Sequence, residues 1–264
     1  MRVADLDRDM RDVVPTGTTR DSTYLFERMT GRTLALAAPA PGRRILDVAS
    51  GFGQDAAALA ARGAFAVAAE PSARMVALAR MARGEGAAGR PWTVRCWADG
   101  LPFASGSFDA VLCKGSLDHF DWPAGALAEM ARVARPGGTV VLAIANFESL
   151  ACRLGRAHDR VREGWLGREL PTGRRKYDVP HDHFTRYELA LMREQASACL
   201  DLELVEGISL FWGVGVFSRW LERLPAALAQ GLLAGLDALA RRAPGLADVV
   251  VLAGRPRRSA RTSA

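Results

Sequence analysis

The sequence has almost no lysine and only one short basic run. Lysine occurs only at positions 114 and 176, and the many arginines are scattered among acidic residues. The net charge is +6 and the isoelectric point is about 9.7. The basic run is the tail Arg255-Pro-Arg-Arg258 with Arg261, which is typical of a solvated terminus. The charge pattern therefore does not indicate a nucleic-acid partner.

Cysteines are also few, and no apolar run is long. The four cysteines contain no C-x-x-C pair, which argues against a disulfide framework and a structural zinc site. The first residues are too charged for a signal peptide. The longest late apolar run, Ile208–Ser218, is too short to cross a bilayer. We therefore expect a cytoplasmic protein without a transmembrane segment.

The first half of the chain alternates between strand-like and helical patterns. We expect strands over 43–49, 65–70, 92–97, 108–114 and 139–146, and helices over 54–62, 73–83 and 123–135. Ser72 is placed to cap the second of these helices. Continuous apolar strands separated by helices predict an α/β, doubly wound, mostly parallel sheet within one domain of 264 residues.

The second half is less regular. Residues 147–183 show few periodic signals, and Thr185-Arg-Tyr-Glu188 predicts a capping box that opens a helix to Cys199. Two further strands are expected over 202–208 and 248–254. Residues 210–242 have amphipathic helical spacing, and a helix is expected over 23–36.

One stretch, ILDVASGFGQDAAALA at 45–60, predicts a ligand-binding turn. Asp47 lies near the end of the strand, and Gly51 and Gly53 allow a tight turn and close ligand approach before the helix. Glu70 ends the next strand at the same edge of the sheet, where its carboxylate can accept hydrogen bonds from two ribose hydroxyls. The sequence therefore predicts a nucleoside-containing cofactor.

Two kinds of cofactor fit this turn at first sight. The run Gly51–Ala56 satisfies the dinucleotide pattern G-x-G-x-x-G/A, which points to an NAD(P)-dependent oxidoreductase. Asp47 counts against that interpretation, because a carboxylate beside the loop suits a cationic partner better than a pyrophosphate. A later block, ADGLPF at 98–103, supplies Asp99, which can accept a hydrogen bond from an adenine amino group.

Four segments together resemble a known family. ILDVASGFG, AAEPSARMVALAR, ADGLPFASGSFDAVLCKGSLDHF and ARVARPGGTVVLAIAN occur in the order found in class I S-adenosylmethionine-dependent methyltransferases, in the group that includes ubiquinone and menaquinone biosynthesis enzymes. The resemblance covers roughly residues 43–146. It departs from the family at Ala49, where most members have a glycine. It implies a seven-stranded Rossmann-like sheet whose last strand is antiparallel.

The resemblance also implies roles for individual residues. Asp47 would orient the loop and the methionine moiety, Glu70 would hold the ribose, and Asp99 would meet the adenine. The remaining cofactor-binding candidates are Tyr24, Ala49, Ser50, Gly51, Gly53, Pro71, Met75, Gly100, Leu101, Lys114, Gly115 and Ser116. For Lys114, a lysine that only extends toward solvent at a strand end is the competing interpretation.

Three histidines are candidates for a catalytic base. His119 follows the fourth strand, where packing above the cofactor is the alternative role. His181 and His183 flank Asp182, but without a further ligand cluster we expect no metal. Their position ahead of the helix after Thr185 favours contact with the methyl acceptor, and a loop histidine bonded to backbone is the alternative.

The complete prediction is a single methyltransferase domain over 1–264. We expect an N-terminal helical cap (1–42), a cofactor-binding core (43–146) and acceptor-side insertions (147–184 and 210–244). The expected reaction transfers a methyl group from S-adenosyl-L-methionine to a small, partly hydrophobic acceptor, leaving S-adenosyl-L-homocysteine. Residues 210–244 predict core packing or a homodimer face, with an acceptor pocket or membrane-surface contact as the second interpretation. A non-catalytic binding protein is a further alternative.

Overall fold

The computed structural model describes residues 19–83, 89–167, 177–178 and 184–257. The strands are β1 (Arg44–Val48), β2 (Phe65–Ala69), β3 (Trp92–Val94), β4 (Phe108–Lys114), β5 (Ala134–Ala145), β6 (Leu200–Ile208) and β7 (Val249–Pro256). The helices are α1 (Arg20–Ala37), α2 (Gln54–Ala60), α3 (Ala73–Arg83), α4 (Pro123–Val133), α5 (Leu150–Leu166), α6 (Leu189–Cys199), α7 (Gly215–Arg223) and α8 (Ala226–Arg242). Short 3-10 turns, η2 (Leu117–His119) and η3 (Pro244–Leu246), complete the fold.

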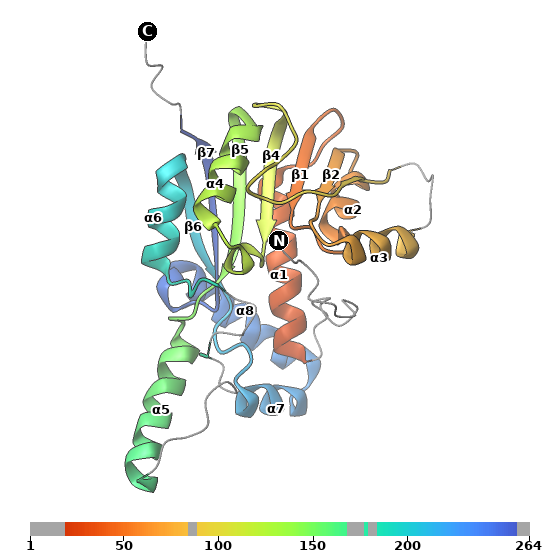
Figure 1. The fold of residues 1–264 in the computed structure, drawn as a ribbon. Coiled ribbons are helices and arrows are strands. Elements are labelled where there is room, and N and C mark those ends of the chain that lie inside the picture. Colours follow the sequence, from red (N-terminus) through yellow and green to blue (C-terminus); the bar gives the residue numbers. More distant parts are fainter. Residues whose placement is uncertain (1–18, 84–88, 168–176, 179–183, 258–264) are drawn as a thin grey trace.

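The seven strands form one sheet in the order β3-β2-β1-β4-β5-β7-β6 (Figure 1). Neighbouring strands from β3 to β5 are parallel, and β7 is antiparallel to both β5 and β6. The predicted mostly parallel, doubly wound sheet with an antiparallel last strand is confirmed. The strand order reverses between β1 and β4, and ligands of open α/β sheets bind at the carboxyl ends of the strands beside such a reversal.

Both faces of the sheet are covered by helices, because successive strand residues point to opposite sides. Leu46, Val111 and Leu142 pack on one side with α4 and α6. Ile45 and Leu112 pack on the other side with α1 and α2, and Val141 and Val251 pack there with α1. These buried layers explain the continuous apolar runs of the central strands.

Several predicted boundaries are wrong in the second half. The predicted capping box at Thr185 does not form: α6 begins at Leu189 after Glu188, without a side-chain cap. The carbonyl of Tyr187 accepts a hydrogen bond from Phe147 N (3.0 Å), and the Tyr187 side chain is completely buried. These contacts hold the segment before α6 extended. Ser72, by contrast, caps α3 as predicted, since its Oγ accepts from Met75 N at 2.9 Å.

Other differences have equally local causes. Helix α5 lies within a segment where few periodic signals were found. The stretch over 210–242, for which amphipathic helical spacing was found, forms two helices, since Pro225, which has no N–H to donate, separates α7 from α8. Strand β5 begins five residues before the predicted start at Thr139, and its pairing with β4 shifts register between Phe108 and Ala110.

Helices α5 and α7 and the first turns of α1 lie beyond the carboxyl edge of the sheet (Figure 1). The start of α1 is fixed to α7: Arg20 donates to the carbonyls of Leu221 (3.0 Å) and Leu224 (2.7 Å), and the buried Asp21 carboxylate accepts from Ser218 Oγ (2.8 Å). Tyr24 packs with Leu221, Ala229 and Leu233. The buried side of 210–244 therefore packs in the core of this chain, as the first interpretation expected.

None of the helices within the described residues combines the length and hydrophobicity needed to span a lipid bilayer.

Close packing of β6 against α8 generates a prediction about two glycines. A Cβ on Gly207 would lie 2.4 Å from both the Ala240 carbonyl oxygen and the Ala247 Cβ. We expect Gly207→Ala to lower the free energy of unfolding by roughly 1–3 kcal/mol, because the overlap forces backbone to move. Urea denaturation followed by circular dichroism measures this change.

Gly231, in the middle of α8, provides the matched control. A Cβ there meets no atom within 4 Å. Since alanine favours a helix over glycine by roughly 0.5–1 kcal/mol, Gly231→Ala should raise the free energy of unfolding. Equal effects of the two substitutions would contradict the packing of β6 on α8.

Candidate cofactor site

The loop after β1 adopts the left-handed backbone that its glycines predict. Gly51 has φ of 52° and Gly53 has φ of 63°. Ala49 also has a positive φ, 54°, at the position where the family usually has glycine. The left-handed conformation costs a residue with a side chain about 1 kcal/mol or more. The contacts around the loop therefore hold Ala49 in a conformation that it disfavours. The Ser50 N–H donates to the Ala69 carbonyl (3.1 Å), which joins this loop to the end of β2.

Glu70 holds this loop against the end of β2. Its side chain is 7% exposed, and its two carboxylate oxygens accept from Gly51 N (2.8 Å) and Ser72 N (2.9 Å). Each carboxylate oxygen has a second lone pair that can accept a further hydrogen bond. The carboxylate is thus oriented by backbone amides at the edge of the sheet, where a pair of vicinal hydroxyls could bind to it.

The neighbouring surface suits an adenosine group. Met75 and Leu78 on α3 are buried and form an apolar cluster with Phe52. A Cβ on Gly51 would approach Met75 Cε at 3.3 Å, so glycine keeps this space open. Within the described part of the chain, the buried Ser50 Oγ has no hydrogen-bond partner. An oriented carboxylate next to an apolar cluster, with an orphan hydroxyl in the same loop, fits a polar, nucleoside-containing ligand.

A buried ion pair underlies the loop. Lys114 Nζ lies 2.7 Å from Asp55 Oδ2 and donates to Asp55 Oδ1 (2.8 Å) and to Thr30 Oγ1 (2.6 Å). Asp47 is 3% exposed and accepts from Ala56 N at 3.2 Å. Burial and the Asp55 carboxylate raise the pKa of Asp47 well above its ordinary value, against the opposing charge of Lys114. Lys114 therefore joins β4 to α1 and α2 and does not simply extend toward solvent.

The loop that carries Asp99 is held by an ion pair that sequence reasoning missed. Glu129 accepts from Leu101 N (2.9 Å), and Arg132 donates to the carbonyls of Leu101 (3.0 Å) and Phe103 (2.8 Å). A hydrogen bond from Arg132 lowers the pKa of Glu129. The i, i+3 spacing of these residues on α4 could have indicated that they pair with each other. Nothing in the sequence indicates that they also form hydrogen bonds with the loop after β3.

The end of β4 leads to the histidine candidates. Gly115 has φ of 64°, and Ser116 Oγ approaches the Ala49 carbonyl at 3.5 Å. His119 lies in η2, immediately after the buried Asp118. The Asp118 carbonyl accepts from the N–H groups of Phe184 (2.8 Å) and Thr185 (3.2 Å). His181 and His183 lie outside the described residues, but the chain directly after them is beside η2.

Most of the predicted cofactor-binding residues thus lie on segments that end at one edge of the sheet. They follow β1 (Ala49, Ser50, Gly51, Gly53), β2 (Glu70, Pro71, Met75) and β4 (Gly115, Ser116), with Asp47 and Lys114 at the strand ends. Tyr24 lies in the apolar cluster with α7 and α8, and its role at the cofactor carboxylate stays a prediction. The roles of the individual site residues likewise stay predictions.

Comparison with known proteins identifies the family. Residues 46–142 match the model of a methyltransferase domain. A ubiquinone biosynthesis O-methyltransferase from Xanthomonas campestris pv. campestris is 32% identical over 168 residues, 64% of this chain and 66% of that protein. Residues 46–142 therefore form a methyltransferase domain of the class I S-adenosylmethionine-dependent type, which confirms the predicted family for this part of the chain.

Other comparisons show how far the likeness extends. A demethylmenaquinone methyltransferase from Clavibacter sepedonicus is 42% identical over 110 residues, 42% of this chain. This chain spans only 44% of that relative's length. The solved structure of the PH0226 protein from Pyrococcus horikoshii has a TM-score of 0.58 and 17% identity, over 95% of this chain and 99% of that one. That likeness shows the fold alone.

The buried ion pair generates a prediction about stability. Lys114→Met removes the cation between two buried carboxylates, and we expect it to lower the free energy of unfolding by roughly 3–5 kcal/mol. The double variant Lys114→Met/Asp55→Asn should recover part of that loss, because it also removes the uncompensated charge. Urea denaturation of both single variants and the double variant measures the coupling. Strictly additive effects would contradict a direct ion pair.

Asp47 generates a prediction about pH. Because its pKa is raised in the folded state, ionised Asp47 destabilises the fold increasingly as pH rises above the ordinary value of 3.8. Asp47→Asn should therefore raise the melting temperature of the ligand-free protein near pH 7, by roughly 2–4 °C for each kcal/mol relieved. The gain should vanish near about pH 4, where unfolded aspartate also becomes protonated. Thermal unfolding across this range tests the sign, and a pH-independent gain would contradict it.

Proposed function

We propose that this chain transfers a methyl group from S-adenosyl-L-methionine to a small-molecule acceptor. The observation that carries the proposal is the buried Glu70 carboxylate, oriented by Gly51 N and Ser72 N at the carboxyl edge of the sheet. The family of the chain supports the same cofactor. When bound, S-adenosyl-L-methionine supplies an electrophilic methyl group on a sulfonium.

The residues of this chain would act mainly by binding and orientation. Glu70 would accept hydrogen bonds from the ribose hydroxyls, and Met75 with Phe52 would contact the adenine. Burial and the Asp55 carboxylate raise the pKa of Asp47, and a cationic ligand nearby would oppose that shift by favouring the ionised carboxylate. Since a sulfonium methyl is already activated, alignment and exclusion of water account for most of the catalysis.

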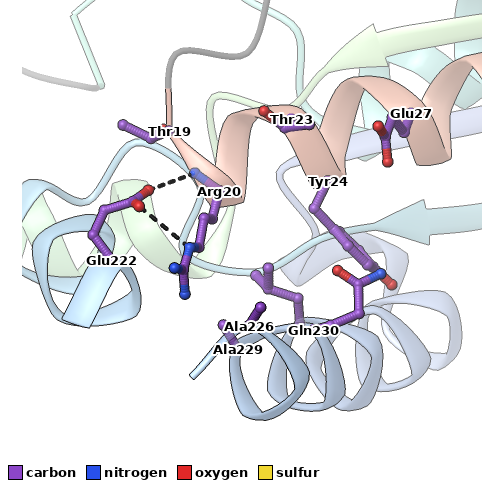
Figure 2. Close-up of a pocket in the computed structure, with 10 residues that line it drawn as sticks. Thr19, Arg20, Thr23, Tyr24, Glu27, Glu222, Ala226, Ala229 and Gln230 are labelled. Carbon is purple, nitrogen blue, oxygen red and sulfur yellow. Dashed lines mark hydrogen bonds and ion pairs between the residues drawn. The ribbon is translucent and has the colours of Figure 1, made fainter. Parts of the chain in front are cut away.

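A cavity among the cap helices supports a small acceptor. It has a volume of about 380 Å³ and lies between α1, α7 and α8, a size that suits a small molecule. Figure 2 shows Tyr24 and Glu27 of α1 and Gln230 of α8 along its wall, with Arg20 paired to Glu222 at one end. The lining also includes Thr19, Thr23, Ala226, Ala229 and Leu233, and this mixture of polar and apolar groups matches a partly hydrophobic acceptor.

A protein base is needed only for an acceptor that must lose a proton. His119 is placed in η2 after the end of β4, which makes it a candidate for that base. His181 and His183 are candidates because Phe184 and Thr185, directly after them, bond to Asp118. We also propose that residues 147–184 and 210–244 form the acceptor side of a cytoplasmic enzyme, whose exposed 210–244 surface contacts a membrane or a second copy.

Calorimetry tests the cofactor assignment. S-adenosyl-L-homocysteine should bind to the purified protein, and NADH should not. Glu70→Gln should weaken S-adenosyl-L-homocysteine binding by roughly 1–3 kcal/mol. The glutamine NH₂ group would face a backbone N–H donor, and it cannot accept a hydrogen bond from the ribose. A preference for NADH would refute the methyltransferase assignment in favour of an oxidoreductase.

Glu203→Gln is the matched control for this experiment. Glu203 is 54% exposed on β6 and pairs with Arg255 at 2.6 Å, so its substitution should leave cofactor affinity unchanged. Thermal unfolding of both variants separates loss of binding from loss of folding. Unchanged affinity in a folded Glu70→Gln protein would mean that Glu70 only braces the loop.

A further inference from the structure

Helix α5 leaves the body of the protein and points away from the sheet (Figure 1). Ser149 caps its first turn, with Oγ accepting from Cys152 N at 3.4 Å, and Ala151 and Cys152 are buried. From Arg153 onward every residue of the helix is exposed or half-buried. Among the residues that the structure describes, most of α5 therefore packs against no hydrophobic core.

The exposed part of α5 nevertheless carries an apolar stripe. Leu154 is 52% exposed, Val161 63% and Trp165 90%. Separations of seven and four positions place these three side chains on one face of a helix with 3.6 residues per turn. Such a face is normally buried, so its exposure indicates a surface that receives something apolar.

Charged residues are distributed unevenly around this stripe. By helical spacing, Arg162 lies beside the stripe and Arg160 lies farther round the helix on the other side, whereas Asp159 and Glu163 lie on the opposite face. Tyr177 lies on that opposite face, where its OH donates to Asp159 Oδ2 at 2.9 Å. The open face thus presents apolar side chains between arginines, with the acids turned away.

Helix α7 repeats this arrangement at the same end of the molecule (Figure 1). Val216 is 72% exposed and Trp220 is 47% exposed, and Arg219 and Arg223 are exposed beside them. The acid of this helix, Glu222, is turned to Arg20, whose backbone N–H and Nε lie 2.8 and 3.3 Å from its carboxylate. Two helices from different parts of the chain therefore share one surface chemistry.

We propose that α5, assisted by α7, binds the surface of an anionic lipid bilayer. An amphipathic helix with tryptophan on the apolar face and arginines beside it lies in the interface, with its apolar side chains among the acyl chains and its cations at the phosphates. A two-fold pairing of α5 with a second copy would instead bring arginines toward arginines, so charge complementarity favours anionic lipid over a copy of this chain.

Cosedimentation of the full-length protein with vesicles tests the proposal. The protein should bind vesicles of phosphatidylcholine containing phosphatidylglycerol and bind pure phosphatidylcholine vesicles much more weakly. Arg162→Gln should weaken binding roughly fivefold, and Trp165→Ser roughly tenfold. Added salt should weaken binding to the anionic vesicles, because it screens the arginines.

Helix α3 offers a matched control. Arg80 and Met81 are exposed there, and Met81 is 77% exposed. Arg80→Gln/Met81→Ser removes the same kinds of side chain as Arg162→Gln/Trp165→Ser, and it should leave vesicle binding unchanged. Equal losses from the two double variants would overturn the assignment to α5, as would failure of the unaltered protein to bind anionic vesicles.

Sedimentation velocity separates the lipid from a second copy. The α5 double variant should have the same oligomeric state as the unaltered protein. A change of that state with unchanged vesicle binding would overturn the proposal and assign the stripe to an interface between copies. Because neither measurement requires methyl transfer, a failure here is distinguishable from a failure of the proposed function.

Discussion

The position of one buried cation constrains the whole candidate site. Lys114 ends β4, and its ammonium group is held by Asp55 of α2 and Thr30 of α1. Asp47, buried at the end of β1, has a raised pKa because of its burial and the Asp55 carboxylate. Strand β4 is thus joined to two helices by a largely buried ion pair beside the end of β1. Removal of Lys114 would leave the Asp55 carboxylate buried without its counter-charge, so the position of this lysine constrains the geometry beneath the loop.

The loop above this cluster, which follows β1, is held in an unfavourable backbone conformation. Ala49 adopts a left-handed backbone that alanine disfavours. The compensation comes from Glu70, whose carboxylate accepts from Gly51 N and Ser72 N, and from the bond between Ser50 N and the Ala69 carbonyl. A carboxylate already oriented by backbone amides loses little freedom when a ligand arrives, which favours tight binding to it.

The helices α1, α5, α7 and α8, here called the cap, differ from the core in how their surfaces are used. Its inner surface is fixed by the contacts of α1 with α7 and α8, through Asp21 and Tyr24. Its outer surface exposes apolar side chains of α5 and α7, among them Trp165 and Trp220. The cavity among α1, α7 and α8 lies on the cap as well. In the proposed function, these helices would therefore contact both the acceptor and the surroundings of the protein, while the strand ends would bind the cofactor.

The sequence by itself determined the fold class, the family and the segments that reach the carboxyl edge of the sheet. Buried strands and turn glycines such as Gly51 leave strong local patterns, and parallel strands necessarily end at one edge. Tertiary structure decided the rest. The Tyr187 carbonyl accepts a hydrogen bond from Phe147 N, and the capping box predicted at Thr185 does not form. Lys114 pairs with residues of two helices that are remote in sequence. These outcomes depend on contacts between distant segments, and no local pattern of residues encodes which distant groups will meet.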